Sequence, residues 1–230
     1  RPLLLLFFLL CFHQANAQVL ISLVFGDKLN SEKVEFGLEG GFNFSNMSNF
    51  QSSTLLPTFN LGFYFDILLK DQWYLNTGVV VKSSVGLDKL SESDVSILDP
   101  PTIFLQSGDY SQKINYFHVP ITIKYRFKNH FFVNIGPQVA LRTKALLIFD
   151  GEQDNKTVEI KTENQDLFTR LEMGVVTGIG YKLRKGKGMN IGFRYFQGLT
   201  DIIKDDEISS RNKSYYFTVG IPIGRKKKDN

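Results

Sequence analysis

The stretch FHVPITIKYRF, residues 117–127, decides the fold. Its odd-numbered positions are all apolar or aromatic, whereas its even positions carry His118, Pro120, Thr122, Lys124 and Arg126. A period of two belongs to a β-strand, because successive strand side chains point to opposite faces and a helix repeats every 3.6 residues. This stretch therefore predicts a strand with one apolar and one polar face.

Seven further stretches show the same alternation, although Val80 interrupts the polar face of one of them. They are residues 34–45, 58–67, 73–85, 131–142, 170–182, 189–195 and 214–221. Most are close to the roughly nine to eleven residues that a tilted strand needs to cross a bilayer. The composition agrees, since 21 Phe, 9 Tyr and 19 Gly in 230 residues favour strands and tight turns.

The connections between these stretches alternate in length. Short links occupy residues 69–72, 128–130 and 183–188, and long polar links occupy residues 46–56, 86–112, 144–166 and 200–212. Membrane barrels have short periplasmic turns and longer extracellular loops. We therefore predict an all-β fold, an eight-stranded antiparallel up-and-down transmembrane barrel, with both ends of the barrel domain on the short-turn side.

The N-terminal residues indicate export. Residues 3–12 form an apolar run too short for a membrane-spanning helix, and Ala15-Asn16-Ala17 follows as a small-x-small cleavage site. The predicted division is a signal peptide at 1–17, a periplasmic lead-in at 18–33, the barrel at 34–224 and a basic tail at 225–230. Cys11 lies in the signal run, so no disulfide supports the mature chain.

The direction of the polar face separates two kinds of eight-stranded barrel. A soluble, lipocalin-like barrel would turn its apolar face inward, whereas a membrane barrel turns that face to lipid. Glycines on the polar face and aromatic residues near the strand ends favour the membrane barrel. Its lumen would hold a network of charges that pair and plug it: Glu39, Asp66, Lys124, Arg126, Arg142, Arg170, Glu172 and Arg194.

The sequence offers little for catalysis or cofactor binding. His118 is the one candidate catalyst, but no Ser/His/acid group can be assembled around it from spacing. We expect no cofactor and no metal, since Asp205-Asp206-Glu207 has the pattern of a solvated loop tip. The net charge of +4 is mild and spread along the chain apart from residues 225–228, so nucleic acid is not an expected partner.

Two motifs resemble a known family. YFHVPITIKY at residues 116–125 and GFRYFQGLTDI at residues 192–202 are similar to the PorT-type outer-membrane β-barrel proteins of Bacteroidetes. This resemblance implies an outer-membrane location and, for the founding member, a part in type IX protein secretion. The ending IPIG at residues 221–224 departs from the family by lacking the terminal aromatic residue of many barrel-assembly signals.

These observations together predict a small, non-enzymatic outer-membrane barrel. Its expected partners are outer-membrane lipid and, through the long loops, other envelope or secretion proteins. The alternatives are a minor pore or a secretion-associated transport component, with a lipid-modifying enzyme as the weakest.

Overall fold

A computed structural model describes residues 31–52, 54–98, 108–153, 156–205 and 208–223. The predicted signal peptide and basic tail, and most of the lead-in, lie outside these ranges. Among the described segments, the first strand begins at Val34 and the last ends at Pro222. None of their helices is long and apolar enough to cross a membrane.

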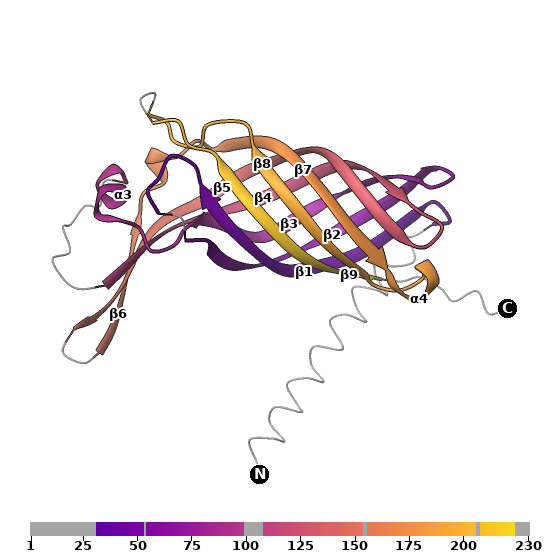
Figure 1. The fold of residues 1–230 in the computed structure, drawn as a ribbon, viewed down its shortest axis with the longest axis horizontal. Helices are drawn as coiled ribbons and strands as arrows, with labels where there is room; N and C mark the ends of the chain where they lie inside the picture. The colour runs from indigo at the N-terminus through magenta and orange to yellow at the C-terminus, as the bar shows by residue number, and fades with distance from the viewer. Residues whose placement is uncertain (1–30, 53, 99–107, 154–155, 206–207, 224–230) are drawn as a thin grey trace, which may run out of the picture.

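Eight antiparallel strands close into a barrel (Figure 1). They are β1 (Val34–Met47), β2 (Leu56–Lys70), β3 (Trp73–Leu87), β4 (Gly108–Arg126), β5 (Phe131–Gln153), β7 (Leu171–Lys182), β8 (Asn190–Gly198) and β9 (Asn212–Pro222). Neighbours follow the order β4-β3-β2-β1-β9-β8-β7-β5, and pairing between β4 and β5 closes the ring. The predicted fold is therefore confirmed.

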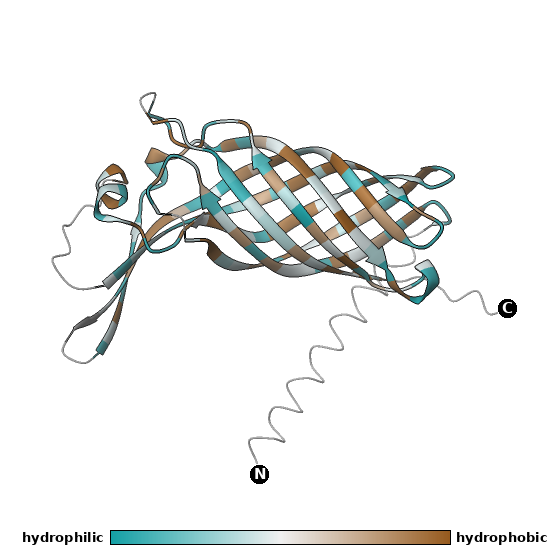
Figure 2. Ribbon diagram, viewed as in Figure 1, coloured by the Kyte–Doolittle hydropathy of each residue, from teal (hydrophilic) through white to brown (hydrophobic). Residues whose placement is uncertain are grey.

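The alternation of the sequence becomes an inside and an outside. Along β7, Leu171, Met173 and Val175 are exposed, whereas the intervening Glu172 and Gly174 are buried. Ile121 and Ile123 of β4 are likewise 46% and 42% exposed, while Thr122 and Lys124 between them are 1% and 4% exposed. Figure 2 shows this alternation of hydrophobic and hydrophilic residues along the wall. A barrel with an apolar exterior and a polar interior suits lipid surroundings.

The two ends of the barrel differ as the link lengths predict. At one end, the short-turn end, Lys70 pairs with Trp73 across a tight turn. Residues 127–130 join β4 to β5 there, and a small turn of helix, α4 (Leu183–Gly186), lies between β7 and β8. The opposite long-loop end carries α3 (Glu92–Ile97) and the 3-10 turn η2 (Gln165–Leu167). By the usual topology of such barrels, the long-loop end faces the cell exterior.

Two of the predicted long links are shorter than expected. The 86–112 link is reduced because β3 continues to Leu87 and β4 begins at Gly108. Most of the 144–166 link is a hairpin formed by the extension of β5 and by β6 (Lys156–Glu163), which projects beyond the barrel (Figure 1). The extension of β5 contains the unbroken apolar run ALLIF, residues 145–149. Ala145 and Leu147 belong to a buried apolar cluster, and Leu146 and Ile148 line a hollow beside the hairpin. A strand with two apolar faces loses the period-two pattern.

Candidate functional site

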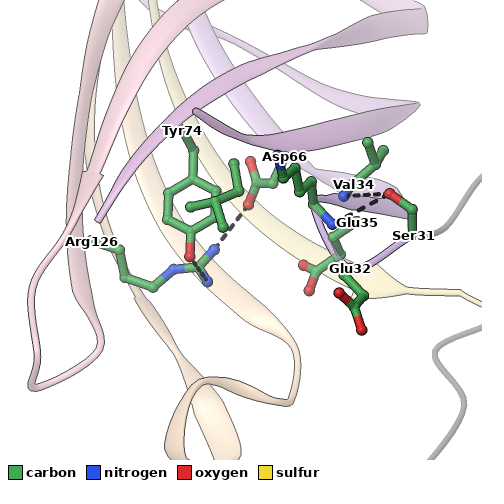
Figure 3. A pocket seen from close by; sticks show the side chains of 9 residues that line it. Ser31, Glu32, Val34, Glu35, Asp66, Tyr74 and Arg126 are labelled. Carbon is green, nitrogen blue, oxygen red and sulfur yellow. Dashed lines mark hydrogen bonds and ion pairs between the residues drawn. The ribbon is translucent and has the colours of Figure 1, made fainter. Parts of the chain in front are cut away.

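Asp66 is the centre of the charge network in the short-turn half of the lumen. Its carboxylate is 1% exposed and accepts two hydrogen bonds from Lys124 Nζ, at 2.7 and 2.9 Å, and one from Arg126 Nη2 at 3.2 Å. Asn76 Nδ2 adds a fourth at 2.7 Å. Figure 3 shows Arg126 reaching Asp66 beside Tyr74, whose ring lies 4.2 Å from the guanidinium carbon. These multiple contacts offset the large cost of removing the charges from water.

Aromatic rings pack beside these charges over interior glycines. The Phe132 ring lies 4.6 Å from Lys124 Nζ, close enough for a cation–π contact. A Cβ at Gly180 would meet Phe132 Cζ at 2.3 Å, and a Cβ at Gly37 would meet Tyr64 Cε1 at 2.4 Å. The glycines of the polar face thus make room for inward-pointing rings, which a narrow barrel cannot otherwise accommodate.

Two ion pairs connect strands that are not neighbours in the barrel. Glu35 of β1 pairs with Lys182 of β7, whose side chain is fully buried, and Glu39 of β1 pairs with Arg194 of β8. Tyr64 donates a hydrogen bond to Glu35 at 3.2 Å. These contacts cross the lumen between strands that lie two and three positions apart in the ring.

The middle of the lumen and its long-loop half contain neutral and acidic groups. His118 is 1% exposed, and its Nδ1 lies 3.1 Å from Gln138 Nε2. Glu172 is fully buried and accepts a hydrogen bond from Asn212 Nδ2 at 2.9 Å. His118 is therefore enclosed by the barrel wall, as a buried structural residue would be.

The two remaining predicted lumen residues lie near the rim. Arg142 is half-buried, and its Nε donates to the carbonyl oxygen of Thr169 at 3.1 Å. Arg170 is exposed and precedes the first residue of β7, Leu171. In the sequence, Arg170 has the same even-numbered phase as the inward-facing Glu172. Because β7 begins only at Leu171, the structure does not bring Arg170 into the lumen network.

Sequence reasoning did not select Glu35 and Lys182 as site residues, although both belong to the polar phase of their strands. Glu35 shares the phase of Glu39, and Lys182 shares the phase of Glu172. Alternation could have placed each in the lumen. It could not have paired them, because the two residues lie 147 positions apart in the chain, on strands that are not neighbours.

The side chains leave little open space in the lumen. One cavity, between Lys124, Asn134 and Arg194, measures about 20 Å³, and another, beside His118 and Gln138, measures about 10 Å³. A cavity needs roughly 10–15 Å³ to hold one water molecule. These spaces therefore suit single waters. A larger hollow of about 80 Å³ lies at the short-turn mouth, beside Asp66, Tyr74 and Arg126 (Figure 3).

An apolar cluster closes the long-loop end, and we call it the apolar cap. Its members come from the strand segments nearest the long-loop end and from the long connections between those strands. Partly buried residues that pack against it are Phe50, Leu90, Tyr110, Leu167 and Ile208. The buried members are Met47, Val85, Leu87, Leu98, Ile114, Tyr116, Ala140, Ala145, Leu147, Phe168, Ile202 and Ile203. The long connections thus share one hydrophobic core.

Backbone hydrogen bonds join the connections around this cap. Ser48 N donates to Arg211 O at 3.0 Å, and Arg211 N donates back to Ser48 Oγ at 2.9 Å. Thr169 N donates to Ile202 O at 2.8 Å. Hydrogen bonds therefore join the β8–β9 connection to two others, the β1–β2 connection and the segment that precedes β7.

Buried polar side chains make two more such links. Gln112 and Asn164 exchange amide hydrogen bonds of 3.1 and 2.8 Å. Asp94 of α3 accepts from the backbone N–H groups of Gln51 and Ser52, each at 2.8 Å, and forms a capping box with Ser91. Burial would raise the pKa of Asp94, but these N–H donors and the Ser91 hydroxyl together hold it below its ordinary value.

The described residues contain no group of three or more His, Cys, Asp or Glu side chains placed to hold a metal ion. The long-loop end presents connections that share one apolar cluster. The lumen contains buried charges that neutralise one another.

Comparison with known proteins agrees with this architecture. The family model for the outer membrane protein beta-barrel domain matches residues 14–204. No curated protein matches the sequence significantly.

Several solved structures are similar in fold at low identity. Ail, the attachment invasion locus protein of Yersinia pestis, is 12% identical, with a TM-score of 0.44 over 84% of this chain and 100% of Ail. Neisserial surface protein A is 12% identical, with a TM-score of 0.40 over 83% of this chain and 99% of that protein. OprG from Pseudomonas aeruginosa is 12% identical, with a TM-score of 0.38 over 84% of this chain and 97% of OprG.

The family match covers most of the chain and includes every barrel strand except β9. The closed ring of eight strands, the lipid-compatible exterior and the filled polar lumen fit the same assignment. The chain belongs to the outer membrane protein beta-barrel domain family, and it is a small β-barrel protein of the bacterial outer membrane.

Proposed function

We propose that this protein is a closed, non-enzymatic barrel of PorT type whose long-loop end is a rigid docking surface for another envelope or secretion protein. The observation that carries the proposal is the apolar cap. Loops that share a core and are linked to one another are ordered before they meet a partner. Preordered surfaces bind with less loss of conformational entropy.

The projecting hairpin gives this surface a distinctive shape. β6 pairs with β5 and ends the strand order, so its other edge has no strand partner within the described sheet. Lys156, Glu159 and Lys161 are exposed along it. Charged residues of both signs discourage non-specific strand pairing, and they suit a partner with a complementary polar surface.

The filled lumen argues against conduction. The charges of the short-turn half are paired, and the apolar cap closes the other half. An eight-stranded barrel is only wide enough for its own side chains. His118 is enclosed by the barrel wall, and its Nδ1 contacts the side-chain amide of Gln138. Both observations argue against an enzyme that works from the lumen.

Site-specific photocrosslinking in the native outer membrane tests the docking surface. A photoreactive residue at Thr157, which is exposed on β6, should yield a discrete crosslinked protein. The matched control is Asp71, which is exposed in a short turn at the other end of the barrel and should not yield that product. No product from Thr157, or the same product from both positions, would contradict the proposal.

Planar-bilayer recording tests the alternative of a minor pore. The closed barrel should give no discrete conductance steps when the purified protein inserts. Reproducible steps that change size in an Arg194→Gln variant would show that ions pass through the lumen, and would favour the transport function instead.

A further inference from the structure

A cavity of about 500 Å³ lies in the barrel wall where β3, β4 and the β5–β6 hairpin meet. Its size is typical of a small-molecule site. Its lining combines apolar side chains, including Phe117, Leu146 and Ile148, with Lys82, Lys113 and Lys161. Glu159 and Lys161 of β6 belong both to this lining and to the docking surface proposed above, which does not otherwise use the cavity.

Strand pairing is irregular at this place. The register of β3 against β4 shifts between Val80 and Ser83, and the register of β5 against β4 shifts beside Tyr116. β-Bulges of this kind redirect side chains and are common beside functional sites.

The cavity lies at the edge of the lipid-facing belt. The outward apolar residues run from Phe127, just after β4, to Phe117 within it. These two are 44% and 42% exposed, and Asn115 and Lys113 follow along β4. Ten residue steps along a strand tilted by roughly 40° rise about 25 Å, the height of the apolar band of an outer-membrane barrel. Lys113 therefore lies at the headgroup level of the leaflet on the long-loop side, and Lys82 and Lys161 line the same cavity.

The charges of the cavity lining are unequal. Lys82, Lys113 and Lys161 face a single acidic residue, Glu159, which pairs with Lys161 at 2.6 Å. The lysines come from three different strands, β3, β4 and β6. Lysines at a membrane boundary extend their amines toward polar headgroups, and three in the lining of one hollow that also contains apolar side chains favour an anionic amphiphile.

We propose that this cavity binds a net-anionic, phosphate-bearing lipid of the outer leaflet. The phosphate would lie among the three lysine amines, and an acyl chain would lie along Phe117 and the outer face of β4. The lipid would thereby fill the angle between the barrel and the projecting hairpin.

Native mass spectrometry of the detergent-solubilised full chain tests this site with three probes. These are short-chain phosphatidylglycerol, short-chain phosphatidylcholine and glycerol phosphate. We expect phosphatidylglycerol to bind at least about tenfold more tightly than phosphatidylcholine, because each lysine near an anionic headgroup contributes severalfold. The K82Q/K113Q/K161Q variant should lose that preference.

The matched control is K70Q/K128Q/K187Q, which removes three exposed lysines at the short-turn end and should keep the preference. Heat-dependent gel mobility checks that both variants fold, and K82Q alone replaces the triple variant if the triple does not. Equal losses in the two variants, or no preference in the unaltered protein, would overturn the proposal. Competition by glycerol phosphate as strong as that by phosphatidylglycerol would also overturn it, since the site would then bind soluble anions.

Discussion

Replacing Asp66 by Asn should destabilise the barrel more than any change to its exposed ion pairs. The substitution keeps the size of the side chain and removes the one carboxylate that both Lys124 and Arg126 contact. Lys124 is 4% exposed, so its amine would remain buried without a counter-charge. Breaking a buried pair in this way costs about 3–5 kcal/mol of unfolding free energy.

The partner substitution should cost less. Lys124→Met leaves Asp66 in contact with Arg126 at 3.2 Å and Asn76 at 2.7 Å, so we expect about 1–3 kcal/mol. In the double variant no amine is stranded, and the combined loss should fall short of the sum by at least about 1 kcal/mol. The reference is Glu163→Gln, which breaks an exposed pair with Lys144 and should cost at most about 1 kcal/mol.

Urea unfolding in lipid vesicles measures these differences through fluorescence. The chain has a single tryptophan, Trp73, which is 48% exposed at the start of β3, so the fluorescence change has one source. Gel mobility of unheated samples gives a second measure of the folded fraction. If D66N unfolds at the same urea concentration as E163Q, or if the double variant shows additive losses, Asp66 is not the centre of the network.

Three further outcomes are expected. Ile121→Arg should cost roughly 2–4 kcal/mol while Thr122→Ser costs far less, and a fluorophore on a cysteine at Ile121 should be quenched by brominated acyl chains; no quenching would mean that this face does not meet lipid. The depressed pKa of Asp94 stabilises the linked loops above the ordinary pKa of an aspartic acid, and this stability is lost as the pH falls below about 4 through the folded-state pKa. Amide exchange at Gln51 and Ser52, corrected for intrinsic rates, should accelerate over that pH range in the unaltered protein but not in D94N. Gly180→Val should lose about 1–3 kcal/mol in the same urea assay, because its Cβ would lie 2.3 Å from Phe132 Cζ, and unchanged stability would show that the ring moves aside freely.

The sequence by itself determined the barrel. Alternation such as that of residues 117–127 specifies strands and their two faces, because the period of a strand does not depend on its neighbours. Link lengths specified which ends have short turns, and the position of Asp66, Lys124 and Glu172 on the polar phase specified that they face inward. Local backbone geometry explains each of these predictions.

Only the tertiary structure decided which residues meet. The pairing of Glu35 with Lys182 and the hydrogen bonds from Gln51 and Ser52 to Asp94 depend on the curvature of the closed sheet and on how loops fold over its rim. Arg170 shows the limit of phase, since a residue just before a strand keeps its phase in the sequence and loses the strand geometry that would direct it inward. The apolar cap also depended on the tertiary structure, because it combines strand residues such as Leu147 with residues of the connections such as Leu98 and Ile202. The run 145–149 has no period-two pattern that could have indicated its inward face.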